Sequence, residues 1–257
     1  MLCNGCMTAP SPISDNIDET FTPERLNAMS MTERTSDAVK AFALRRHNDA
    51  AEHVLWWLWR RQEKDTPTPL QPRQRSMFFL DCGRGPFAVT AAHVFEQFRA
   101  NLQTHRVRTF RVTSEEIAAT GKRIVRGTDG VWPPPPNTGE AVFFGGFPGV
   151  ERVPVAPHEI SFGLYGAMVP LTDFTEYQLS ARMEPEYRVD VRDLGLPPEG
   201  YDLGGVSGGP MLQPVFQNGV WCWRLVGVLS EAVAVQGFER ITAVRAHFIL
   251  PDGRLSY

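Results

Sequence analysis

A serine set among glycines is the feature of this sequence best suited to chemistry. It stands in the segment GGVSGGP (204–210), with Ser207 at its centre. Glycines let a backbone turn sharply and approach a ligand closely, and such a turn can direct successive N–H groups at one point, as an oxyanion requires. A serine hydroxyl held there becomes a usable nucleophile when an imidazole removes its proton. The segment therefore predicts acyl transfer, provided that a histidine lies near it.

His93 is the candidate for that imidazole. It ends the segment FAVTAAH (87–93), in which a strand-like run and two small alanines precede the ring and leave it room to project. Each segment alone has a plainer interpretation, a flexible glycine turn or a structural histidine. Their joint presence, in the order His then Ser and with strand-like runs around both, favours a catalytic pair.

Short apolar runs between Gly and Pro turns make up the chain beyond residue 73, and they are the elements that would position the pair. The runs are MFFL (77–80), FAVTA (87–91), FRV (110–112), AVFFGGF (141–147), EISFGLYGAMV (159–169), GPMLQPVF (209–216), VWCWRLVGVL (220–229) and ITAVRAHFIL (241–250). Many short strands at such spacing indicate a sandwich or a barrel. The four prolines at 133–136 are expected to form a stiff connector between two β units, a docking peptide being the less favoured reading.

The first 72 residues have a different texture. Residues 1–35 are polar and rich in Ser, Thr, Pro and Asp, which predicts a disordered arm. Residues 36–72 predict a helical extension and a proline-rich linker: apolar residues recur at near-helical spacing from Val39 onward, and Ser36 can cap the first turn. The run VLWWLW (54–59) is also compatible with a buried strand.

Two histidines of this extension, His47 and His53, have no partner cluster in the sequence. We expect both on the polar face of a helix.

Composition narrows the classes of function. The 257 residues include 26 Lys+Arg and 29 Asp+Glu, a formal charge of −3, so no strong field favours nucleic acid. A membrane-spanning helix needs ~20 apolar residues in succession, and no such run is present. The four cysteines are scattered, which excludes a disulfide framework, and the single CxxC at Cys3 and Cys6 is too little for a zinc site. The polar start lacks the apolar stretch of an export signal, so a cytoplasmic location is expected.

On these residues the sequence resembles the trypsin-like (chymotrypsin-fold) serine proteases, bacterial type. VTAAHV is similar to the histidine motif of that family, and GVSGGP to its serine motif, usually written GDSGGP. LVGVLSE (225–231) resembles the strand after the nucleophile, AVFFGGFPG (141–149) the first strand of the second barrel, and residues 241–250 the closing segment. The resemblance covers roughly residues 75–257.

The resemblance implies an all-β fold of two six-stranded antiparallel barrels, with an added N-terminal helical segment. The protease domain would be 73–257, its first barrel about 73–130 and its second about 138–250. The implied function is that of a serine endopeptidase acting on a peptide or protein substrate, with no metal or organic cofactor. The oligomeric state does not follow from it.

The resemblance also implies a role for individual residues. Ser207 would be the nucleophile and His93 the general base and acid, while the N–H groups of Gly205 and Ser207 would form the oxyanion hole. Ser230 would lie on the strand that aligns the substrate, and Tyr201 would stand at the base of the specificity pocket. Val206 replaces the family's usual aspartate before the serine, so activation by N-terminal cleavage is not expected.

The third member of the triad is missing from its expected place. The family's aspartate heads a strand that matches TFRV (109–112), where this chain carries Arg106 at the Asp position. Residues 94–105, between His93 and Arg106, predict a helix instead of strands, so the first barrel is expected to be incomplete. The alternatives are therefore a catalytically impaired homologue that binds peptides or proteins, and a damaged reading frame. The other carboxylates considered for the role are Glu96, Asp129, Asp173, Asp190 and Asp193.

Overall fold

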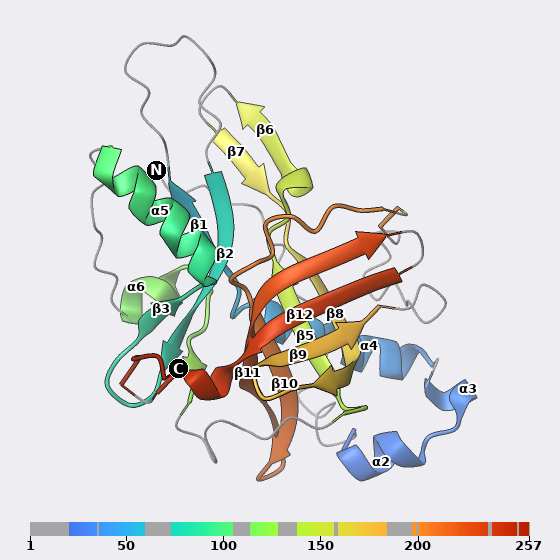
Figure 1. The fold of residues 1–257 in the computed structure, drawn as a ribbon. Coiled ribbons are helices and arrows are strands. Elements are labelled where there is room, and N and C mark those ends of the chain that lie inside the picture. The colour runs from blue at the N-terminus through green and yellow to red at the C-terminus, as the bar shows by residue number, and fades with distance from the viewer. Residues whose placement is uncertain are drawn as a thin grey trace.

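The computed structural model shows a mostly β protein with one closed barrel, a smaller sheet and an N-terminal helix (Figure 1). The residues that it describes are 21–34, 36–59, 73–104, 114–127, 138–156, 159–183, 197–198, 200–235, 238–250 and 252–256. None of the helices among them is long and apolar enough to span a bilayer.

The barrel is six-stranded, and every neighbouring pair of strands in it is antiparallel. Its strands are β5 (Ala141–Gly146), β8 (Tyr165–Phe174), β9 (Gln178–Arg182), β10 (Pro210–Gln217), β11 (Val220–Val235) and β12 (Phe238–Arg245). Around the barrel they follow the order β10-β11-β12-β9-β8-β5. The expectation of a six-stranded antiparallel barrel is thus confirmed for one barrel.

Neighbouring residues of the barrel strands serve two different cores, because successive side chains of a strand point to opposite faces. Phe144 and Met211 belong to the core inside the barrel. Phe143 and Leu212 belong to a second core, which they share with Phe78 of the smaller sheet. The apolar runs of the sequence therefore cover both faces of the barrel wall and join the barrel to its neighbour.

The smaller sheet has four strands and mixed direction. Its strands are β1 (Leu55–Trp59), β2 (Arg73–Asp81), β3 (Phe87–Val89) and β4 (Val125–Arg126). β2 pairs antiparallel with β1 and β3 and parallel with β4. Among the described residues of the first half this sheet stands in place of a first barrel, so the expectation of two six-stranded barrels is met by one barrel only. The predicted strand FRV (110–112) lies outside the described residues.

The remaining elements are short helices and one hairpin. They are α2 (Pro23–Ala28), α3 (Met31–Arg34), α5 (Ala92–Thr104), α6 (Ser114–Ala119), the 3₁₀ turns η1 (Gly149–Glu151) and η3 (Ala246–Phe248), and the hairpin β6 (Arg152–Ala156) and β7 (Glu159–Phe162). The hairpin projects away from the barrel (Figure 1). α5 matches the helix predicted over 94–105. Residues 21–34, predicted as part of a disordered arm, form α2 and α3 instead.

The N-terminal extension forms the helix α4 (Asp37–Ala51) and then the strand β1. The run VLWWLW is therefore a strand for its last five residues, which pair with β2. The prediction of polar-face histidines was wrong: His47 is 5% exposed and His53 8% exposed. The Nε2 atom of His47 lies 3.0 Å from the carbonyl oxygen of Gly166 in β8, and the ring of His53 bonds to the carbonyl oxygen of Asp49.

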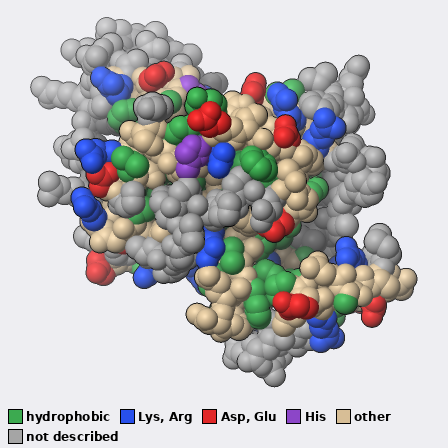
Figure 2. All heavy atoms as spheres, turned by 60° about the horizontal axis from the view of Figure 1, so that its bottom comes forward, with side chains coloured by type: hydrophobic (Ala, Val, Ile, Leu, Met, Phe, Trp, Pro, Cys, Tyr) green, Lys and Arg blue, Asp and Glu red, His purple; other side chains and the backbone are tan. Residues whose placement is uncertain are grey.

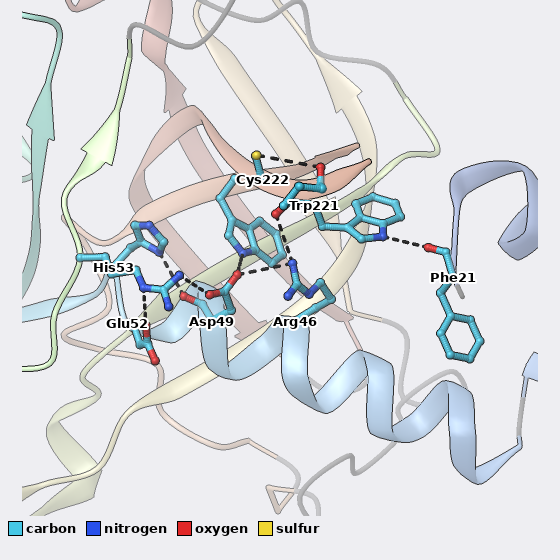
Figure 3. Close-up of polar contacts among 10 residues, drawn as sticks. Phe21, Arg46, Asp49, Glu52, His53, Trp221 and Cys222 are labelled. Carbon is cyan, nitrogen blue, oxygen red and sulfur yellow. Dashed lines mark hydrogen bonds and ion pairs between the residues drawn. The ribbon is translucent and has the colours of Figure 1, made fainter. Parts of the chain in front are cut away.

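A polar cluster fastens α4 to the outside of the barrel (Figure 3). The carboxylate of Asp49 accepts a hydrogen bond from Trp223 Nε1 at 3.0 Å and from Arg123 at 2.5 Å, and it pairs with Arg46 at 3.5 Å. The indole N–H of Trp221 in β11 donates to the carbonyl oxygen of Phe21, which precedes α2, at 2.8 Å. These partners are far apart in the sequence, so the extension is held to the barrel as part of one structure.

Charges of both signs lie interspersed on the face of the molecule drawn in Figure 2. Lys and Arg side chains alternate there with Asp and Glu side chains, in keeping with a formal charge of −3.

Candidate functional site

The glycine segment around Ser207 forms a tight turn that leads into β10. Within it the N–H of Val206 donates to the carbonyl oxygen of Leu203 at 3.1 Å, and the N–H of Gly209 donates to that of Val206 at 3.0 Å. The N–H of Gly208 donates to Leu229 of β11 at 2.8 Å. The turn is thus bonded both to itself and to the barrel, so its backbone has a defined conformation.

Two glycines of the turn are required by its shape. Gly205 has a φ of +113° and Gly208 a φ of +92°, which side-chain-bearing residues rarely adopt. A Cβ on Gly205 would lie 2.7 Å from the carbonyl oxygen of Phe147. A Cβ on Gly208 would overlap the Thr90 hydroxyl and the carbonyl oxygen of Ser76. The pattern GGxSGG therefore serves both backbone conformation and close packing.

The amides of Gly205 and Ser207 have no acceptor among the described residues, although those of Gly204, Val206, Gly208 and Gly209 all do. Their directions are nevertheless fixed. In a trans peptide the N–H points opposite to the C=O of the same unit. The Gly204 carbonyl accepts from Gly149 N–H at 2.7 Å, and the Val206 carbonyl accepts from Gly209 N–H. Each free amide therefore points away from the N–H group that the carbonyl of its own unit accepts.

The Ser207 hydroxyl lies against β11. Its Oγ donates a hydrogen bond to the carbonyl oxygen of Ser230 at 3.2 Å, and Ser230 Oγ donates to the carbonyl oxygen of Thr242 in β12 at 3.1 Å. Ser230 stands where the register between β11 and β12 shifts, as in a β-bulge, and a bulge turns a side chain away from the regular ladder. The predicted residues Ser207 and Ser230 are thus brought together directly.

His93 is the second residue of α5 and is exposed. Its ring makes no hydrogen bond with any residue that the structure describes, Ser207 included. The two candidate segments nevertheless meet, because Gly208 packs on the Thr90–Ala91 segment: a Cβ there would stand 3.1 Å from the N atom of Ala91. Ser207 is the neighbour of Gly208, and His93 lies two residues beyond Ala91.

No carboxylate within the described ranges pairs with His93. Arg106, Asp129, Asp190 and Asp193 lie outside those ranges. Asp173 accepts a local hydrogen bond from the Phe174 N–H in β8 at 2.8 Å, and Glu96 is exposed on α5. The described residues therefore offer a serine, a turn with two free amides and an accessible imidazole.

Tyr201, which precedes the glycine turn by three residues, is half buried. Its ring stacks on Tyr165 with 5.4 Å between centroids, and its hydroxyl donates to Glu151 Oε1 at 2.5 Å. Burial, together with the hydrogen bond to Glu151, raises the pKa of Tyr201 well above its ordinary value. The phenol therefore remains neutral and continues to donate to the carboxylate.

Sequence reasoning missed one buried polar residue beside the site, Ser76 of β2. It is 0% exposed and bonds to the glycine turn. The available signal was its register: Ser76, Phe78 and Leu80 alternate along β2 on one buried face, and a lone serine in such a series needs polar partners.

The structure places this chain in a structural class: it is a mostly β protein with a closed six-stranded antiparallel barrel. A glycine turn centred on Ser207 leads into one strand of that barrel. Comparison of the sequence with models of known families gives no match, and comparison with curated proteins gives none either.

Proposed function

We propose that this protein is a serine hydrolase of the trypsin-like kind that cleaves peptide bonds through Ser207, assisted by His93. On this proposal the smaller sheet takes the place of the family's first barrel in reduced form. The observation that carries the proposal is the pair of free amides, Gly205 and Ser207. A turn that bonds its other N–H groups and leaves these two without an acceptor among the described residues is suited to binding an oxyanion.

The edge of β11 supports a peptide as the substrate. From Glu231 to Val235, β11 pairs with β12 on one side, and its pairing with β10 ends at Val228. No described strand covers the other side of this stretch. An unpaired strand edge offers alternate N–H and C=O groups to an extended peptide, and this edge begins beside Ser230, which the Ser207 hydroxyl contacts.

The proposed reaction proceeds by acyl transfer. His93 takes the proton of Ser207 Oγ as the oxygen attacks the scissile carbonyl, and the negative charge that develops on the carbonyl oxygen is met by the two amides. His93 then gives the proton to the leaving amine, and the acyl group remains on Ser207. Water, deprotonated by His93, releases the acid and restores the serine.

The expected rate is low for this class. Exchanging the triad aspartate for asparagine in a related enzyme lowers kcat about 10⁴-fold, and no described carboxylate takes that place here. An activated ester, whose leaving group needs no proton, is therefore a better first substrate than an amide.

Labelling with a fluorophosphonate probe tests the proposal. We expect folded protein to be labelled at Ser207, and labelling to be lost in Ser207→Ala and strongly reduced in His93→Ala. Ser161→Ala, which removes an exposed serine of β7, is the matched control and should label normally. Absence of labelling in folded wild-type protein would contradict the proposal.

A peptide-binding protein without turnover is the second candidate. It is favoured by one observation, that His93 has no hydrogen bond with Ser207 or with a described carboxylate. Here the β11 edge would bind an extended peptide that is not cut. Binding of a labelled peptide mixture to wild-type protein, with no product by mass spectrometry and no fluorophosphonate adduct, would favour this candidate over the first.

A further inference from the structure

Ser76 lies at the contact between the smaller sheet and the barrel. It is a buried residue of β2, and a buried hydroxyl is costly unless its hydrogen bonds are satisfied. Both of its roles are filled: Ser76 Oγ donates to the carbonyl oxygen of Gly205 at 2.8 Å, and it accepts from the N–H of Phe147 at 2.8 Å. The hydroxyl thus joins the glycine turn to the chain that leaves β5.

We propose that Ser76 is a positioning residue that sets the aim of the two free amides; this inference rests on the proposed hydrolase function. Three successive peptide units carry the geometry. The outer two hold the free N–H groups of Gly205 and Ser207, and their carbonyls are bonded by Gly149 and Gly209. The carbonyl of the middle unit, that of Gly205, is bonded by Ser76.

Loss of that bond acts on both amides, because the middle unit connects the outer two. Gly205 has no Cβ to restrict rotation, so its carbonyl orientation depends on the donor that it faces. The N–H of the same unit, that of Val206, donates to the carbonyl oxygen of Leu203 at 3.1 Å, the only other hydrogen bond that the described residues make to this peptide. Without the hydroxyl the unit can tilt, and the directions of the Gly205 and Ser207 N–H groups then vary.

Ser76 also contacts the segment that precedes the histidine. Its carbonyl oxygen accepts a hydrogen bond from Thr90 Oγ1 at 2.9 Å, and Gly208 packs against both groups. One residue of β2 therefore touches the turn that carries Ser207 and the segment that leads to His93. A serine that only stabilised the fold would occupy the same position. The test must therefore distinguish an effect on the orientation of the two N–H groups from an effect on the stability of the fold.

The test compares Ser76→Ala with wild type on an activated peptide ester and with a peptide boronic acid, which binds serine hydrolases as a transition-state analogue. Removing a whole oxyanion donor costs about 10²- to 10³-fold in kcat, so misaiming should cost about 10- to 100-fold. We expect that loss in kcat with KM unchanged, and an equal loss in boronic acid affinity. Both effects follow because oxyanion contacts strengthen only in the transition state.

Two further variants and one control complete the experiment. Ser76→Thr keeps the hydroxyl and should restore most of the activity. Ser76→Cys keeps a side chain of similar shape whose thiol is only a weak donor, so its activity should resemble that of Ser76→Ala. If the alanine variant does not fold, the cysteine variant is used in its place. Thr172→Val removes a hydroxyl that donates to a carbonyl of β9 at 2.9 Å, away from the site, and should leave kcat unchanged.

Each outcome decides the matter. An active wild type with equal kcat and boronic acid affinity in folded Ser76→Ala or Ser76→Cys overturns the role of Ser76 alone. A change in KM with kcat unchanged overturns it as well. A folded wild type without ester turnover and without fluorophosphonate labelling overturns the proposed function, and the role of Ser76 with it.

Discussion

Replacing Gly208 by alanine should force apart the two segments that meet at the candidate site. The added Cβ would overlap both the Thr90 hydroxyl and the Ser76 carbonyl oxygen, which are hydrogen-bonded to each other at 2.9 Å. The Ser76 oxygen is backbone, and the Thr90 hydroxyl can turn away only by breaking its hydrogen bond to that oxygen. The turn that carries Ser207 must therefore move away from the segment that leads to His93.

The expected cost has three parts. A non-glycine residue at a φ of +92° costs about 1–3 kcal/mol. Overpacking adds about 1–3 kcal/mol, and loss of the hydrogen bond between Thr90 and Ser76 about 1 kcal/mol more. Gly219→Ala is a matched control, because Gly219 has a φ of +81° and nothing within 4 Å of the added Cβ. It pays the backbone cost alone, so Gly208→Ala should be less stable than the control by about 2–4 kcal/mol.

Urea unfolding and fluorophosphonate labelling measure the two consequences. Gly208→Ala should lose labelling at Ser207 even where most of the protein is folded, whereas Gly219→Ala should label at the wild-type rate. Equal losses of stability in the two variants would refute the reasoning, because they would show that the turn is not packed against Thr90 and Ser76. Normal labelling of Gly208→Ala would refute the link between that packing and the site.

Three further changes test the surroundings. Asp49→Asn should lower the free energy of unfolding by about 2–3 kcal/mol in urea titrations, because it weakens the charge-assisted bonds at Asp49, among them that of Trp223. Burial lowers the pKa of His53, so the unfolded chain binds the proton more readily. Stability should therefore fall as pH drops below about 6.5, by at most about 1.4 kcal/mol per pH unit, and His53→Gln should remove this part of the slope. Tyr201→Phe removes the hydrogen bond to Glu151 and should shift selectivity for the residue before the scissile bond, measured as kcat/KM on paired ester substrates.

The barrel was largely predictable because its strands signal themselves locally. The runs 141–147, 209–216 and 220–229 are apolar, bounded by turn residues, and found as β5, β10 and β11. The first half of the chain was less predictable from the sequence. VLWWLW has no decisive period, and pairing with β2 determines that it is a strand. β4 pairs parallel with β2, although the two segments are far apart in the sequence. A strand of two residues is too short to be predicted from a local pattern.

Buried His47 shows why some polar residues were harder to place than apolar ones. His47 and His53 were assigned to a solvated helix face because no partner stood near them in the sequence. The partner of His47, the Gly166 carbonyl, comes from β8, 119 residues away. A polar side chain is buried when a distant backbone group satisfies it, and a local pattern carries no information on that group.

The same distinction bears on the candidate site: its serine turn could be proposed from the sequence, whereas an acid partner for His93 could not. The direction of the Ser207 amide is set locally, because the Val206 carbonyl of the same peptide unit accepts from Gly209 N–H, whereas the Gly204 carbonyl beside the Gly205 amide accepts from Gly149, in another part of the chain. An acid that orients His93 would have to come from another strand or helix, at no fixed spacing from either residue. On the proposed function, the activity therefore depends on how well distant residues such as Ser76 hold the turn.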